Sequence, residues 1–352
     1  MSVAPIGLPY RPPCPEGSSP LDFVCSRGTV PSMTVTRRKF LGWGGVLLAT
    51  AAGAAGTWTA TSRSRTARWL RELARDTTRR VRPAFARPEP ARWPRNAITV
   101  CWLGHATALI DFYGIRILTD PVFSRRVGID LGLATLGPKR RIAPALNPAE
   151  LPPIDVVLLS HAHMDHLDIP SLGRLRPPGM VVTAKETADL LADTPLREAH
   201  ELGWGDEVVF RNDLGELRIR AFAVNHWGRR WPSDRNRGYN GYLLAREGKA
   251  VLFGGDTAMT SAFADVRSFG PFEFALMPIA AYDPWIRAHC TPEQALLMAD
   301  QAGARRLVPL HHSTFKLSDE PMEEPVARLE HALRHEPERL ALRHVGEHAA
   351  SS

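Results

Sequence analysis

Short apolar segments separated by turn residues run along the chain from residue 98 onward. The segments at 98–103, 108–111 and 115–119 have the length of strands, and the pair Tyr113-Gly114 between the last two predicts a tight turn. We therefore expect this region to open with a β-meander, in which consecutive strands pair side by side.

Later apolar segments share one property, which is that polar residues able to take part in chemistry follow each of them directly. These segments are residues 155–159, 217–224, 250–254 and 306–310. Helical patterns lie at 187–192, 292–302 and 322–333. Strands that alternate with helices predict an α/β layered body.

The N-terminal part of the chain has a different composition. Residues 1–32 are rich in Pro, Gly and Ser without periodicity, which predicts disorder, and the pattern favours Met33 as the first translated residue. Within 33–62, the pair Arg37-Arg38 precedes an uncharged, moderately apolar run. This pattern resembles a twin-arginine export signal, and the run is also long enough to stay in the bilayer as an anchor.

Such a signal predicts contact with the twin-arginine export machinery. It also predicts a protein that is exported, either periplasmic or anchored to the outer face of the bacterial inner membrane. Residues 63–95 predict a basic helix followed by a Pro-rich linker. The helix fits contact with an anionic membrane surface, and it equally fits a solvated linker.

The net charge of +7 belongs to this N-terminal part. Residues 1–60 hold 5 basic and 2 acidic residues, and residues 61–95 hold 11 and 3, which leaves 28 basic and 32 acidic residues for 96–352. The body is therefore mildly acidic. A broad basic surface for nucleic acid is excluded, and no nucleic-acid partner is expected.

Metal-binding side chains are concentrated directly after the apolar segment 155–159, in the sequence His161-Ala162-His163-Met164-Asp165-His166. Imidazole and carboxylate together suit zinc, and less often iron or manganese. The chain has four cysteines but no CxxC pair, so a thiolate zinc site does not compete with this interpretation.

One loop cannot fill two coordination shells, so further ligands must come from other strand ends. The candidates are His226, Asp256 and either His311 or His312, each of which follows a predicted strand. Four chain segments would then meet at one metal site.

These motifs resemble those of the metallo-β-lactamase superfamily, and within it the N-acyl-phosphatidylethanolamine phospholipase D family. The resemblance covers most of the body. The matching segments are residues 102–107, 119–124, 137–140, 151–155, 226–227, 255–257 and 311–315. The resemblance implies an αββα sandwich over residues 96–348 with two zinc ions at one edge.

The resemblance also implies the ligands of each ion. Those of the first are His161, His163 and His226, those of the second are Asp165, His166 and His311, and Asp256 bridges the two ions. His311 is favoured over His312 because an aromatic residue follows the ligand in the family, and His312 occupies that aromatic position.

In the family, a metal-bridging hydroxide attacks the substrate. Carried over to this chain, the resemblance implies Asp165, Asp256 and His289 as catalytic residues, and His289, Trp227 and His105 as substrate contacts. Two alternatives stay open: His289 could simply flank the helix predicted at 292–302, and His105 could satisfy backbone groups.

We therefore expect a metal-dependent hydrolase that carries two zinc ions and acts on a phosphodiester, in the manner of a phospholipase D. A lactonase or esterase of the ascorbate-phosphate lactonase type is the alternative, and a non-catalytic metal-binding protein is a third reading. The stretch 282–289 is shorter than in mammalian relatives, and 239–242 differs from them. The sequence thus leaves open whether the substrate is a phospholipid, another phosphodiester or a lactone.

Overall fold

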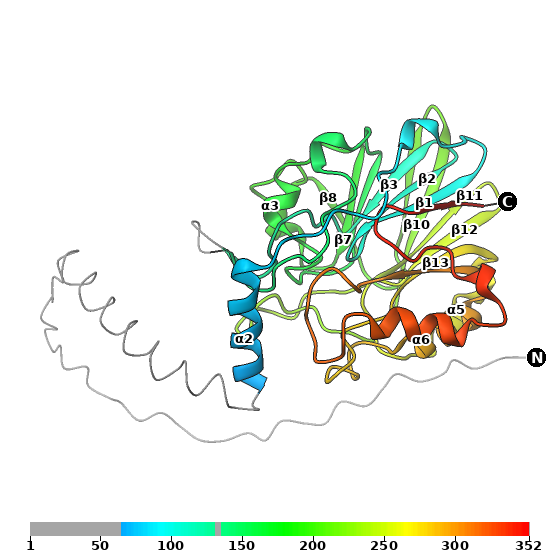
Figure 1. Ribbon diagram of the computed structural model, residues 1–352. Helices are drawn as coiled ribbons and strands as arrows, with labels where there is room; N and C mark the ends of the chain where they lie inside the picture. The colour runs from blue at the N-terminus through cyan, green and yellow to red at the C-terminus, as the bar shows by residue number, and fades with distance from the viewer. Residues whose placement is uncertain (1–64, 131–134, 352) are drawn as a thin grey trace, which may run out of the picture. The chain divides into compact units, whose positions relative to one another are not determined.

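The computed structural model describes residues 65–130 and 135–351 (Figure 1). The disorder predicted for residues 1–32, the start at Met33 and the export signal or anchor at 33–62 lie outside the described residues and stay predictions. Within the described residues, no helix is long and apolar enough to cross a membrane.

The first sheet has seven strands in the order β15-β1-β2-β3-β6-β7-β8 (Figure 1). They are β1 (Ile98–Gly104), β2 (Thr107–Phe112), β3 (Ile115–Thr119), β6 (Val156–Leu159), β7 (Met180–Ala184), β8 (Ala199–Leu202) and β15 (His348–Ala350). Strands β1, β2 and β3 pair antiparallel, so the predicted β-meander is confirmed. Its turn uses Tyr113 and Gly114 at φ 54° and 90°, since two positive φ values suit the twist of a hairpin.

The second sheet has six strands in the order β14-β13-β12-β11-β10-β9. They are β9 (Glu207–Asn212), β10 (Gly215–Phe222), β11 (Gly241–Arg246), β12 (Lys249–Phe253), β13 (Phe272–Pro278) and β14 (Ala304–Leu310). A separate ribbon pairs β4 (Ile129–Asp130) with β5 (Thr135–Leu136). The strands predicted near 217–224, 250–254 and 306–310 are thus confirmed within a few residues.

The helices are α2 (Arg65–Thr78), α3 (Ile169–Leu172), α4 (Ala262–Asp265), α5 (Pro292–Ala302) and α6 (Glu324–Ala332). Short 3-10 helices are η1 (Pro90–Arg92), η2 (Pro148–Glu150), η3 (Ala188–Leu191), η4 (Arg267–Phe269) and η5 (Pro337–Arg339). Helices α5 and α6 confirm two of the predicted helices, whereas the third shortens to η3. A capping box starts α5, because the Thr291 hydroxyl accepts a hydrogen bond from the Gln294 amide.

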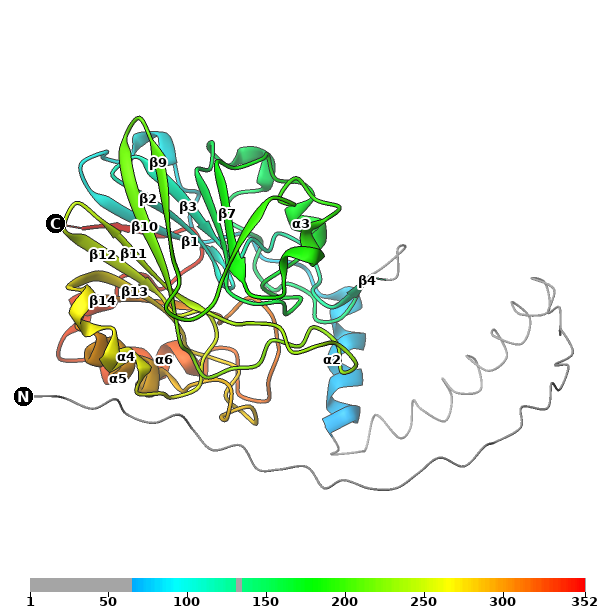
Figure 2. The ribbon, with the colours of Figure 1, turned by 180° about the vertical axis from the view of Figure 1, so that it is seen from behind.

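Two large apolar cores lie between the layers and hold them together. Residues of both sheets, such as Trp102, Leu109 and Phe253, share the first core. Helices α4, α5 and α6 lie along the outer face of the six-stranded sheet (Figure 2). The second core joins these helices to the sheet through residues such as Phe263 and Met298. The order of layers follows the predicted sandwich, in which two sheets pack face to face and helices cover them.

Parallel strands set the position of the candidate site. Strand β3 is parallel to β6, and β12, β13 and β14 are parallel to one another. The carboxyl ends of parallel strands meet at the same edge of a sheet, which is where α/β proteins place their ligands. Asp120, His161, Asp256 and His311 follow β3, β6, β12 and β14 at such ends.

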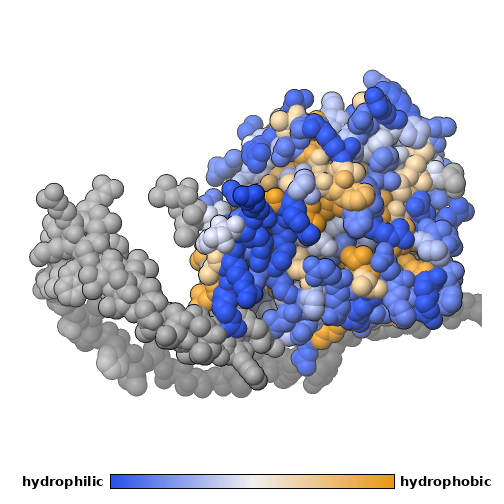
Figure 3. All heavy atoms as spheres, viewed as in Figure 1, coloured by the Kyte–Doolittle hydropathy of each residue, from blue (hydrophilic) through white to orange (hydrophobic). Residues whose placement is uncertain are grey.

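Helix α2 lies where the sequence predicts a basic helix, and the segment 65–95 also makes contacts with the rest of the body. The buried carboxylate of Asp76 on α2 accepts a hydrogen bond from the Lys139 amide at 2.8 Å, and the Arg82 amide donates to the Arg141 carbonyl at 2.9 Å. These residues therefore belong to the body, because their backbone and side chains find partners there. The face of α2 seen in Figure 3 is hydrophilic.

At the C-terminal end of the body, β15 pairs with β1 and extends the body to Ala350, past the expected end at 348.

Candidate metal centre

All seven side chains predicted as metal ligands lie together at the edge described above. They are His161, His163, Asp165, His166, His226, Asp256 and His311, from the loops that follow β6, β10, β12 and β14. Their ligand atoms form overlapping groups within which every atom lies within 4.8 Å of the others, and two of these groups also include His105 or His289. The assignment of each residue to a metal ion stays a prediction.

Three imidazoles form the first ligand group, His161, His163 and His226. The Nδ1 atom of His163 lies 2.8 Å from Nε2 of His161 and 3.2 Å from Nε2 of His226. The loop after β6 supplies two of the rings, and the loop after β10 supplies the third. The three nitrogen atoms thus face one common point.

Asp165, His166 and His311 form the second ligand group. Oδ2 of Asp165 lies 3.3 Å from Nε2 of His311 and 3.7 Å from Nε2 of His166. Oδ2 of Asp256 lies 3.1 Å from His166 Nε2 and 3.2 Å from His311 Nε2, and it is 3.9 Å from Nε2 of His226 in the first group. Asp256 therefore stands between the two groups, as expected of a bridging ligand.

The spacing of these atoms fits a metal ion. Around a tetrahedral zinc ion with bonds of about 2.0–2.1 Å, neighbouring ligand atoms lie roughly 3.3 Å apart. Several of the separations above are close to that value. In addition, Nε2 of His166 and His311 and Oδ1 of Asp256 are buried and make no hydrogen bond. Buried polar atoms without partners are costly, and a bound cation would remove that cost.

The outer nitrogens of three rings are held by other groups. Nδ1 of His166 donates to Oδ2 of Asp120 at 2.7 Å, and Nδ1 of His226 donates to the Ala288 carbonyl at 2.8 Å. Nδ1 of His161 lies 2.9 Å from the Ser160 hydroxyl, which itself donates to Asp120 at 2.6 Å. Such contacts fix the orientation of metal-binding imidazoles.

Sequence reasoning assigned no role to Asp120 and Ser160. Asp120 directly follows the predicted strand at 115–119, so the signal available was its place at a strand end. Its carboxylate also accepts the Ser160 amide at 2.7 Å, which joins the ends of β3 and β6. Asp120 thus supports the loop that carries four of the seven predicted ligands.

Burial keeps the first ligand group uncharged. It lowers the pKa of His161 and His226 well below the ordinary value, and it lowers the pKa of His163 to about 4. Neutral imidazole is the form that binds metals.

Carboxylates reverse this trend in the second group. Burial lowers the pKa of His166 and His311, but Asp256 and the neighbouring carboxylates together outweigh it. The pKa of His166 therefore lies well above the ordinary value, and that of His311 rises to about 9. Burial raises the pKa of Asp256, yet His166 and His311 outweigh it and hold that pKa well below the ordinary value. Positive charge is thus favoured beside Asp256, and a divalent cation can supply it in place of protons.

His105 does not occupy the position expected of a substrate contact. Its side chain is fully buried, and its Nε2 lies 3.0 Å from Oδ2 of Asp165. Burial lowers the pKa of His105 to about 3, so the neutral ring donates to the carboxylate. His105 therefore orients Asp165 from a buried position, and it is not among the residues that line the cavity described next.

A cavity of about 650 Å³ opens beside the two groups. Trp227 and His289, both predicted to contact the substrate, line it together with Arg229, Arg230, Trp231 and Trp285. Trp231 is 41% exposed. Nδ1 of His289 is buried without a hydrogen bond and lies 3.8 Å from Oδ2 of Asp256. Sequence reasoning missed Arg229, Arg230 and Trp285, since nothing in their spacing marks a cavity wall.

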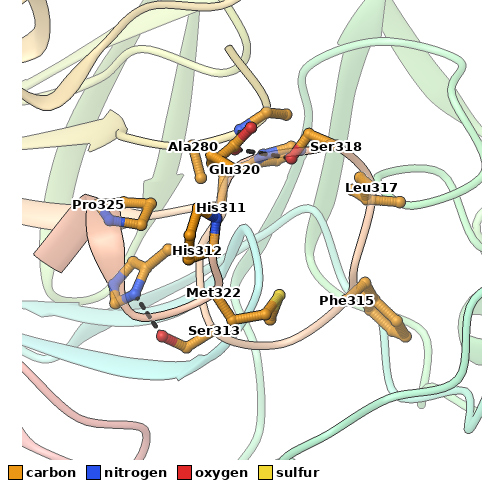
Figure 4. Close-up of a pocket in the computed structure, with 12 residues that line it drawn as sticks. Ala280, His311, His312, Ser313, Phe315, Leu317, Ser318, Glu320, Met322 and Pro325 are labelled. Carbon is orange, nitrogen blue, oxygen red and sulfur yellow. Dashed lines mark hydrogen bonds between the residues drawn. The ribbon is translucent and has the colours of Figure 1, made fainter. Parts of the chain in front are cut away.

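His312 belongs to a different environment from His311. Its ring packs on Trp102 at 4.3 Å between centroids, and its Nδ1 lies 2.9 Å from the Ser313 hydroxyl. Both histidines line a cavity of about 10 Å³, which has room for about one water molecule (Figure 4), but His311 also lines the larger cavity and His312 does not. The geometry thus favours His311 as the ligand, as the resemblance implied.

Comparison with known proteins places this site in a family. The model of a family described as the beta-lactamase superfamily domain matches residues 115–312. An uncharacterized protein of Mycobacterium tuberculosis is 33% identical over 254 residues, which cover 70% of this chain and 66% of the relative. The N-acyl-phosphatidylethanolamine-hydrolyzing phospholipase D 1 of Caenorhabditis elegans is 30% identical over 242 residues, which cover 63% of this chain and 65% of the relative. The chain therefore spans just under two thirds of these relatives.

A solved structure supports the fold. The isothiocyanate hydrolase from Delia radicum gut bacteria matches with a TM-score of 0.57 at 17% identity, over 72% of this chain and 99% of that one. A likeness at this identity shows the fold, and it agrees with the predicted sandwich.

The contrast between the two adjacent histidines can be tested by metal content. We expect His311→Ala to bind less metal than the wild type, because it removes a nitrogen of the second ligand group. His312→Phe should bind as much metal as the wild type, because it retains the ring that packs on Trp102 and removes no ligand. Zinc per chain is measured by elemental analysis after dialysis, with thermal unfolding as the check on folding. Equal zinc loss in the two variants would contradict the assignment.

Proposed function

The chain belongs to the beta-lactamase superfamily domain family, and on that premise we propose that it is a dinuclear zinc hydrolase that cleaves a phosphodiester. The observation that carries the proposal is the position of Asp256, whose Oδ2 lies within 3.2 Å of two ring nitrogens in the second ligand group and 3.9 Å from one in the first. A carboxylate so placed can serve two ions at once.

In this proposal the first ligand group would hold one zinc ion and the second group the other, with Asp256 available to both. Bound zinc ions would supply Lewis-acid chemistry, which lowers the pKa of a water molecule and neutralises charge on the attacked group. His166 and His226 keep their orientation through Asp120 and the Ala288 carbonyl. Asp165 stays ionised, because His166, His105 and His311 outweigh the effect of burial and hold its pKa well below the ordinary value.

His289 holds the substrate in this proposal. Burial lowers its pKa to about 4, so the ring is neutral at pH 7 and carries one N–H. It lines the cavity beside Asp256, and its Nδ1 has no hydrogen-bond partner. An N–H in that place can donate to an anionic oxygen of the substrate, and the bond strengthens as charge grows during the reaction.

The lining of the cavity supports an amphiphilic substrate with an anionic group. Trp227, Trp231 and Trp285 offer apolar surface, while Arg229 and Arg230 bring positive charge to the same wall. A phospholipid combines these properties, and the Caenorhabditis elegans relative is named for hydrolysing one. We therefore favour a phospholipid or a similar phosphodiester over a lactone, which has no anionic group at the attacked centre.

A panel of substrates tests the proposed reaction. We expect the zinc-loaded protein to hydrolyse bis(p-nitrophenyl) phosphate and an N-acyl-phosphatidylethanolamine in detergent micelles, with release of phosphatidic acid from the lipid. Asp256→Asn provides the background rate, because it removes the bridging charge. Hydrolysis of γ- or δ-lactones without any cleavage of the two diesters would overturn the proposal in favour of the lactonase.

A second test concerns His289. We expect His289→Ala to lower the turnover of the diester about 100-fold, as loss of one donor to a developing charge does. Zinc content and thermal stability should not change, because His289 belongs to neither ligand group. His200→Ala is the matched control, since His200 is exposed on β8 away from the cavity. Unchanged turnover in His289→Ala would make this residue a helix-flanking histidine, and loss of zinc would make it a ligand.

A further inference from the structure

One side chain joins the two loops that supply the first ligand group. Arg230 lies in the loop after His226, and its Nη1 donates to the carbonyl of Ala162 at 2.7 Å and to that of Leu167 at 2.8 Å. Ala162 separates His161 from His163, and Leu167 directly follows His166. The two carbonyls therefore stand at the two ends of the metal-binding sequence.

Both N–H bonds of Arg230 Nη1 are occupied. Nη1 of an arginine carries two N–H bonds, and here each has its own carbonyl acceptor. Within the loop itself, the amides of His166 and Leu167 both donate to the carbonyl of His163, at 3.0 and 2.8 Å. The loop is thus a turn closed from inside by His163 and from outside by Arg230.

The loop that carries Arg230 is itself fixed by contacts of Arg237 and Gly228. The guanidinium of Arg237 is bound by the carboxylates of Asp189 and Asp234, with contacts between 2.6 and 3.2 Å. Gly228 packs so closely on Arg237 that a Cβ atom there would lie 1.9 Å from its carbonyl oxygen. Arg230 therefore reaches the metal-binding sequence from a fixed base.

We propose that Arg230 is a positioning residue that holds the loop after β6 and the loop after β10 at the separation the first metal ion needs. We call the two hydrogen bonds from Arg230 to Ala162 and Leu167 the tether. It joins the loop of His161 and His163 to the loop of His226, so its loss would let the distances between these three rings increase. The inference rests on the proposed zinc site but not on the identity of the substrate.

Arg229 provides a matched control. It lines the same cavity and carries the same charge, but its Nε donates to Asn236 within its own loop at 2.7 Å. Arg229→Met thus changes the charge of the cavity by one without touching the metal-binding sequence. Arg230→Met makes the same change in charge and also removes both bonds of the tether.

Zinc affinity, measured without substrate, distinguishes loss of the two hydrogen bonds from the change in cavity charge. The full chain is stripped of metal and titrated with Zn²⁺ against a chelator of known affinity, and circular dichroism checks that each variant is folded. We expect Arg230→Met to bind the more weakly held ion about 10- to 100-fold less tightly than the wild type, as loss of supporting contacts does at metal sites. Arg229→Met should bind as the wild type does. Arg230→Lys should fall between them, since its ammonium can donate to both carbonyls from a more flexible stem.

Equal zinc affinity in Arg230→Met and the wild type would overturn the proposal. A raised KM for the diester in that case would mean that Arg230 only contacts the substrate. If Arg230→Met does not fold, Arg230→Gln and Arg230→Lys carry the test, and equal zinc affinity in these two and the wild type again contradicts the tether. A wild-type chain that binds no zinc would instead contradict the proposed function, so the two failures are distinguishable.

Discussion

The carboxylate of Asp256 is the group on which the rest of the site depends. It is buried, and ring nitrogens of His166, His311 and His226 surround one of its oxygens. A buried anion is stable only beside positive charge, and protons on the imidazoles or metal ions are the two available sources. Metal ions have the further advantage that they also occupy the ring nitrogens that make no hydrogen bond.

The fold meets this constraint by bringing distant parts of the chain to one edge. Parallel strands of two packed sheets end there, and the loops that follow them carry the ligands. Asp120 ties the ends of β3 and β6 together, and Arg230 ties the loop after β6 to the loop after β10. The loops that carry the ligands are therefore hydrogen-bonded to one another and to the strand ends, which orients the ligands. The cavity beside the site takes its apolar wall and its positive charge from the loop after β10 and the segment before α5.

Local pattern was enough to predict much of this arrangement. The β-meander, helices α5 and α6 and the gathering of ligand candidates follow from residue order, since each candidate directly follows an apolar strand or lies in the sequence after one. The choice of His311 over His312 came from the resemblance to the family. The role of His105 did not follow, because a Gly-His turn does not reveal which side of Asp165 it faces. Nor did the attachment of residues 79–95, whose prolines predict a linker but whose partners lie far along the chain. The role of Arg230 could not be predicted for the same reason, because its acceptors are backbone carbonyls that no sequence pattern marks.

Anomalous X-ray diffraction at the zinc edge, from crystals of the full chain as purified, tests the central claim most directly. The account predicts two peaks about 3.5–4 Å apart, one beside each ligand group, with Asp256 in contact with both. A single peak, or two peaks of which neither contacts Asp256, would contradict it.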